Sequence, residues 1–164
     1  RGPLADEIGL PSALKSWSGQ ELTHKDFSCS DKWYEVKTIS RGNSSVRISS
    51  LEQLDSDKDG QLIVYSLEKM SPAYNGISLN KLILETRQMF MSGDESDDFL
   101  AKVALQGYEY NNYYDEFVYE VSNFVRYMVG YDFPKLTHKN VPMAISKANY
   151  DISLSDIMNF RTDK

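Results

Sequence analysis

The sequence lacks several features that define common protein classes. Cys29 is the one cysteine among its 164 residues, so no disulfide can form within the chain and no CxxC pair can hold zinc. A reducing, cytoplasmic setting suits such a chain. The two histidines, His24 and His138, form neither an HxxxH nor an HExxH pair, which argues against a zinc protease. Glycine-rich phosphate loops, a GxSxG elbow and a Rossmann fingerprint are also missing.

Long apolar runs and excess positive charge are missing as well. No apolar run approaches the ~20 residues that span a bilayer, so we expect no membrane span. The first residues carry acids and no apolar core of a signal peptide. The formal net charge of −6 argues against holding nucleic acid by bulk charge alone. It is compatible with an enzyme that combines a local basic groove with an acidic, metal-binding pocket.

The remaining composition predicts one globular domain of mixed type. Hydrophobic residues make up 41% and charged residues 26%, which is ordinary for a folded domain with a core. The expected elements run as strands early, helices in the middle and strands late, a mixed α+β order unlike a Rossmann alternation. They are a hairpin over 26–40, short elements to 55, a buried strand over 60–70, helices over 79–91 and 98–107 with an acidic loop between them, a strand over 117–130 and a strand pair over 143–154.

The segment from Asp55 to Ser66 matches the start of an EF-hand loop, with acids at positions 1, 3 and 5 and Gly60 at position 6. An EF-hand also needs a bidentate glutamate at position 12, where this chain has Ser66. Residues 61–66 have the composition of a strand, whereas an EF-hand continues into a helix. We therefore predict an acidic turn here and no calcium site.

The hairpin segment carries the most informative polar residues. In a strand, Trp33, Glu35, Lys37 and Ile39 point to one face. One interpretation is a cross-strand ion pair on a solvated face. The other adds Asp26, which lies opposite Glu35 to Lys37 if the two strands pair. Two carboxylates and an ammonium at one sheet edge suit Mg²⁺-dependent hydrolysis of a phosphodiester, since carboxylates hold the metal and a lysine orients water or stabilises charge.

This array, Asp26 followed by Glu35-Val36-Lys37, resembles the signature of the PD-(D/E)XK nuclease superfamily. Four further segments occur in order and make nearly the whole chain similar to a bacterial family of PD-(D/E)XK motif proteins: Trp17–Phe27, Tyr34–Ser40, Ile48–Asp55 and Tyr131–Thr137. The resemblance implies a restriction-endonuclease-like domain over 1–164, with a mixed central sheet flanked by helices.

The resemblance also implies roles for individual residues. Asp26 and Glu35 would bind Mg²⁺ or Mn²⁺, with the Val36 carbonyl as a further ligand, and Lys37 would be the catalytic lysine. Gln53 stands where many members have a helical polar residue near the site; the alternative is a plain helix-surface residue. Five basic residues are candidates for phosphate contacts: Arg41, Arg47, Lys135, His138 and Lys139.

One expected acid has no clear counterpart. The superfamily adds an acid from a helix before the hairpin, and we expect that helix upstream of residue 1. Glu7 and Glu21 are the nearby substitutes. The resemblance implies a metal-dependent nuclease acting on DNA, with endonuclease and exonuclease action both open, in a restriction or phage-defence setting that is compatible with an ATPase, helicase or methyltransferase partner and with a dimer. The alternative is a catalytically inactive module on the same fold that binds nucleic acid or protein.

Overall fold

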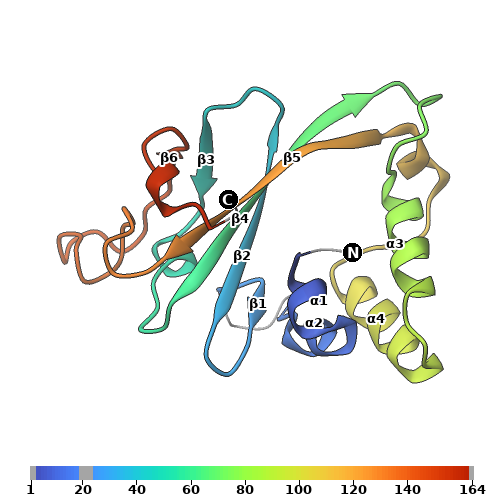
Figure 1. Cartoon of the computed structure of the whole chain (residues 1–164), viewed down its shortest axis with the longest axis horizontal. Coiled ribbons are helices and arrows are strands. Elements are labelled where there is room, and N and C mark those ends of the chain that lie inside the picture. Colours follow the sequence, from blue (N-terminus) through green and yellow to red (C-terminus); the bar gives the residue numbers. More distant parts are fainter. Residues whose placement is uncertain (1–2, 19–23, 163–164) are drawn as a thin grey trace. The chain divides into compact units, whose positions relative to one another are not determined.

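A computed structural model describes residues 3–18 and 24–162 (Figure 1). The chain divides into two compact units, which we describe separately. The helical unit contains residues 1–22 and 68–120, and the sheet unit contains residues 23–67 and 121–164. The prediction of one domain over 1–164 stays a prediction. Among the described residues, every helix is too short or too polar to cross a bilayer.

The sheet unit is built around a mixed sheet with strand order β1-β2-β4-β5. Strand β1 pairs with β2 antiparallel, and β2 pairs with β4 parallel. A second sheet pairs β3 with β6 antiparallel (Figure 1). This confirms the predicted mixed α+β fold. The elements are β1 (Phe27–Ser28), β2 (Trp33–Ser40), β3 (Ser45–Ile48), the 3₁₀ turn η1 (Leu51–Gln53), β4 (Gly60–Met70), β5 (Val118–Val129), β6 (Tyr150–Ser153) and η3 (Met158–Phe160).

Strand β4 lies between two other strands because its centre is apolar on both faces. Leu62, Ile63 and Val64 are all buried, as the continuous apolar run predicts. Strand β4 begins at Gly60 and continues to Met70, through the residues where an EF-hand would continue into a helix, so the predicted acidic turn before this strand is confirmed. The sheet unit closes over one apolar core, formed by Trp33, Val46, Ile48, Leu54, Leu62, Val64, Tyr127, Val129, Phe133, Ile152 and Ile157.

Trp33 fixes the start of β2 against the start of β4. Its Cα is paired with that of Gly60. A Cβ added at Gly60 would lie 2.1 Å from a Trp33 ring carbon, so the ring occupies the space that any larger residue needs. The indole N–H donates to the Lys58 carbonyl at 2.9 Å, which holds the ring in place. Because Glu35 follows Trp33 by two residues on the same face of β2, this contact also fixes the position of Glu35 along the strand.

The helical unit contains α1 (Pro3–Ile8), α2 (Leu10–Ser16), α3 (Leu79–Gln88), α4 (Gly93–Leu105) and the 3₁₀ turn η2 (Asn112–Glu116). The predicted cap of α3 is confirmed, since Ser78 Oγ accepts from the Lys81 N–H at 3.2 Å. Leu14, Ile83, Phe99 and Val103 form the core of this unit.

Two expected boundaries were wrong. Helix α4 begins at Gly93 and not at Asp98, so the predicted acidic loop is its first turns; Asp94 and Glu95 there lie at the positive end of the helix dipole. Gly107, with φ +85°, follows the helix end as predicted. The predicted strand pair over 143–154 is one strand, β6. Residues 141–149, all within the described part of the chain, form no strand.

Candidate functional site

Asp26 is placed by the hairpin, in the register that the sequence predicts. Phe27 pairs with Tyr34 and Ser28 with Trp33, so one further step sets Asp26 opposite Glu35. Strand β1 begins at Phe27, and the next donor of β2 past that pairing, the Val36 N–H, donates to Asp26 Oδ2 at 2.8 Å. A carboxylate thus takes the place of a strand carbonyl, which satisfies the Val36 amide and holds Asp26 against β2.

Glu35 and Lys37 form a tight ion pair on one face of β2. Lys37 Nζ lies 2.8 Å from Glu35 Oε1, and the side chains are 17% and 2% exposed. The interpretation of a pair on a solvated face was therefore wrong, because the Glu35 carboxylate is almost completely withdrawn from water. The Lys37 side chain is itself mostly buried, and its ammonium lies against the Glu35 carboxylate.

The electrostatics of this pair favour a further cation. Burial raises the pKa of Glu35, and the nearby negative charge of Asp26 raises it further, while the hydrogen bond and charge of Lys37 and the charge of Lys25 oppose the rise. The Glu35 carboxylate is therefore costly to ionise and lies within the electrostatic reach of the Asp26 carboxylate. A divalent cation between them would stabilise both ionised forms.

The donor atoms at this edge suit Mg²⁺ or Mn²⁺. In a strand, the N–H and C=O of one residue point to the same neighbouring strand, so the Val36 carbonyl lies on the Asp26 side of β2. Asp26, Glu35 and this carbonyl supply only oxygen donors, which hard divalent cations prefer, and Mg²⁺ commonly keeps several waters. Among the described residues, no three His, Cys, Asp or Glu side chains gather into a metal cluster. The set therefore fits a cation that accepts few protein ligands.

Lys25 is a residue of this site that the sequence analysis missed. Its Nζ donates to the carbonyls of Gln53 at 2.9 Å and Asp55 at 2.8 Å, and also to that of Glu52. The same ammonium lies 4.4 Å from the ring centre of Trp33. Burial is the main cause that lowers the pKa of Lys25 to about 8.

These contacts tie together three segments around the site. Lys25 directly precedes Asp26, Trp33 lies two residues before Glu35, and the carbonyls belong to the end of η1, where Gln53 lies. The ammonium compensates the orphan carbonyls that any helical turn leaves at its C-terminal end. No local sequence signal marks this role, because the acceptors are backbone atoms almost thirty residues away along the chain.

Gln53 uses its side chain locally. Its Oε1 accepts from the Ser49 N–H at 2.7 Å, which closes the turn at the start of η1. The backbone carbonyl of Gln53 is joined to the site through Lys25, whereas a role for its amide side chain stays a prediction. Of the two substitute acids, Glu7 is exposed on α1 of the helical unit, and Glu21 lies outside the described residues.

Most of the predicted phosphate contacts are engaged in surface ion pairs. Arg47 binds Asp151 through two nitrogens, at 2.5 and 2.9 Å. Nε2 of His138 lies 2.8 Å from Glu52 Oε1, and this contact is the main cause that lowers the pKa of Glu52 to about 2. Lys139 Nζ lies 2.8 Å from Asp57 Oδ1. Exposed pairs of this kind are weak, and the predicted phosphate contacts stay a prediction. Arg41 also has a partner, and Lys135 lines a pocket described below.

The chain was also compared with models of known protein families. The model of the family described as "Putative PD-(D/E)XK family member, (DUF4420)" matches residues 3–155, nearly the whole chain. The matched range contains Asp26, Glu35, Lys37 and Gln53. No curated protein and no solved structure matched the chain.

Proposed function

Because the chain belongs to this PD-(D/E)XK family, we propose that it is a metal-dependent nuclease that hydrolyses phosphodiester bonds, with DNA as the substrate. Its superfamily generally depends on divalent metal. The observation that carries the proposal is the buried Glu35 carboxylate, paired with Lys37 at 2.8 Å and set opposite Asp26 by the hairpin register. A restriction or phage-defence setting, a partner ATPase, helicase or methyltransferase, and a dimer belong to the same proposal.

Each residue has a proposed role that its contacts support. Asp26, Glu35 and the Val36 carbonyl would hold Mg²⁺ or Mn²⁺, which when bound would lower the pKa of water and neutralise charge on the scissile phosphate. Lys37, held by Glu35, has further ammonium hydrogens to orient the attacking water or to stabilise charge that develops on phosphate. The Val36 N–H fixes the Asp26 carboxylate.

A second function is supported by different observations. The net charge is −6, and the described residues bring no third acidic side chain into the site. A catalytically inactive module that binds nucleic acid or protein would need neither metal nor Lys37. The two proposals therefore differ in one measurable property, the affinity for divalent cations.

The test is a calorimetric titration of the full chain with Mn²⁺ and then Mg²⁺. We expect Asp26→Ala and Glu35→Ala each to weaken Mn²⁺ binding at least about tenfold, since each removes a ligand. Asp31→Ala, which removes an exposed acid from the loop of the same hairpin, is the matched control and should bind as the wild type does. Mn²⁺-dependent cleavage of DNA should be lost in Lys37→Ala with metal binding retained. A wild-type chain that binds neither cation would overturn the nuclease proposal in favour of the binding module.

A further inference from the structure

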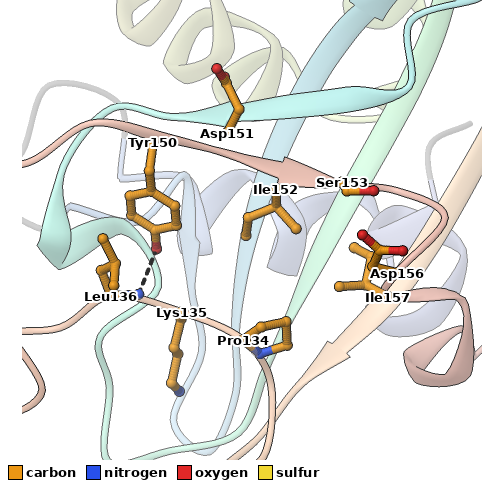
Figure 2. Close-up of a pocket in the computed structure, with 9 residues that line it drawn as sticks. All are labelled: Pro134, Lys135, Leu136, Tyr150, Asp151, Ile152, Ser153, Asp156 and Ile157. Carbon is orange, nitrogen blue, oxygen red and sulfur yellow. Dashed lines mark hydrogen bonds between the residues drawn. The ribbon is translucent and has the colours of Figure 1, made fainter.

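The sheet unit contains a pocket that the metal site does not use. It has a volume of about 500 Å³ and lies between strand β6 and the loop 134–136 (Figure 2). This volume is in the usual range for small-ligand sites. Ile152 and Ile157, both buried members of the core, form its apolar floor, and Pro134 and Leu136 are exposed at its edge.

The aromatic wall of the pocket is held in a fixed orientation. The Tyr150 hydroxyl accepts a hydrogen bond from the Leu136 N–H at 3.1 Å, shown as the dashed line in Figure 2. Burial raises the pKa of the Tyr150 hydroxyl, so this side chain stays neutral at physiological pH. The Tyr150 ring and the Pro134 ring offer flat apolar surfaces, which suit a planar heterocycle.

Two charged side chains with no ion pair in the described chain border the pocket, Lys135 on the loop 134–136 and Asp156 after β6. Lys135 is half-buried, and within residues 24–162 no hydrogen bond or ion pair engages its ammonium. Asp156 follows β6 in Figure 2, and the one polar contact of its carboxylate in the described chain is the Ser155 hydroxyl, 3.3 Å from Oδ1. Asp151 differs, because Arg47 already holds its carboxylate. Lys135 and Asp156 are thus the charged groups that a ligand can bind.

We propose that this pocket binds an unpaired nucleotide, with the base on the apolar floor, its exocyclic amino group donating to Asp156 and its phosphate beside Lys135. A nucleotide has a planar base, an anionic phosphate and an amino group that donates hydrogen bonds. These three groups match the apolar floor, the Lys135 ammonium and the Asp156 carboxylate of the pocket. A leucine or phenylalanine side chain from a partner protein would leave both charges unused. Adenine, cytosine and guanine carry an exocyclic amino group, whereas thymine offers only carbonyl acceptors there.

The position of Lys135 relates the pocket to the metal site. Its charge acts on Asp55, Asp59 and Lys25, and the charge of Lys25 acts in turn on Glu35. The Lys135 ammonium is therefore near enough to Asp55, Asp59 and Lys25 for their charges to interact, and Lys25 directly precedes the proposed metal ligand Asp26. The inference rests on the proposed function in this respect: the bound nucleotide would belong to the strand that is cleaved.

The experiment measures nucleotide binding in the absence of divalent metal. Amide spectra of the ¹⁵N-labelled full chain are recorded in EDTA during titrations with deoxyadenosine monophosphate, thymidine monophosphate and deoxyadenosine. We expect shifts confined to residues 134–136 and 150–157, and the tightest binding for deoxyadenosine monophosphate. Lys135→Gln should weaken that binding roughly fivefold to tenfold and leave deoxyadenosine unchanged, because it removes only the phosphate contact. Asp156→Asn should abolish the preference over thymidine monophosphate.

A lysine on an exposed segment provides the matched control. Lys147→Gln removes the same charge outside the pocket and should bind as the wild type does. The proposal is overturned by shifts elsewhere in the chain, by an absence of shifts at millimolar nucleotide, or by equal weakening in Lys147→Gln. A parallel titration with indole tests for a partner's apolar side chain, and indole binding as tightly as the nucleotide would also overturn the proposal. Because metal is excluded, failure of Mn²⁺ binding and failure of this pocket are separate results.

Discussion

Replacing Gly60 by alanine tests the contact on which the site rests. The added Cβ would lie 2.1, 2.2 and 2.6 Å from three carbons of the Trp33 ring, far closer than atoms can approach. The ring cannot turn aside without losing the hydrogen bond from its N–H to the Lys58 carbonyl. Backbone strain does not add to this cost, since Gly60 has no positive φ.

The expected loss of stability follows from two terms. Forcing a methyl group into a packed core costs about 1–3 kcal/mol, and the lost indole hydrogen bond about 1 kcal/mol. We therefore expect Gly60→Ala to lower the free energy of unfolding by roughly 2–4 kcal/mol, a large part of the total stability of a typical domain. Because Lys25 lies over the same ring, Mn²⁺ affinity should fall in the molecules that remain folded.

Urea unfolding followed by circular dichroism and by tryptophan fluorescence measures this effect. Gly93→Ala is the control, because nothing lies within 4 Å of a Cβ there and Gly93 begins helix α4. It should leave stability unchanged or raise it by up to about 1 kcal/mol. If Gly60→Ala unfolds at the same urea concentration as the wild type, the packing of Trp33 on Gly60 is wrong, and so is the argument for how Glu35 is placed.

Three further changes test other parts of the structure. Lys25→Met should lower stability by roughly 1–3 kcal/mol and weaken Mn²⁺ binding, since it leaves the η1 carbonyls without a donor, and Lys25→Arg should restore part of both; equal unfolding midpoints and equal affinities would refute the tether. The double change Glu35→Leu with Lys37→Met should abolish metal binding while leaving stability equal or higher by about 1–4 kcal/mol, because apolar pairs often replace buried ion pairs without loss; a clear destabilisation in thermal unfolding would contradict this. The hydrogen bonds from Ser78 and from Asn80 hold the pKa of Asp115 below its ordinary value of 3.8. The stability that the ionised Asp115 contributes is therefore present above pH 3.8 and is lost as the pH falls through the lowered pKa. Asp115→Asn should flatten the fall of stability at acid pH, and an unchanged fall would show that this network does not contribute.

The parts of the fold that the sequence predicted are those with local, periodic signals. The spacing between Asp26 and Glu35 predicted the hairpin register because strand alternation leaves few ways to pair such short segments. The apolar run 62–64 predicted a buried strand for a similar reason. The sequence did not predict the start of α4, because a run of acidic residues is compatible both with an exposed loop and with the first turn of a helix, whose positive dipole end stabilises Asp94 and Glu95.

The parts that could not be predicted depend on partners far away in the sequence. Glu52 pairs with His138 and Asp57 with Lys139. Exposed charges have many possible partners of similar energy, so composition cannot select among them. Lys25 shows the same limit more sharply. Its buried ammonium is defined by backbone carbonyls, which every residue has, and no residue type could have indicated them.

The late start of strand β1, at Phe27, explains how the candidate site is built. A β1 that began before Asp26 would pair with Val36 and engage its N–H and C=O in the ladder. Instead the N–H is taken by the Asp26 carboxylate, and Lys25 turns to the carbonyls of η1. One interrupted strand thus holds an acid at the sheet edge, keeps a backbone carbonyl on the same side and brings η1 close. Extending the hairpin ladder through Asp26 would therefore remove the site even if every side chain in it were kept.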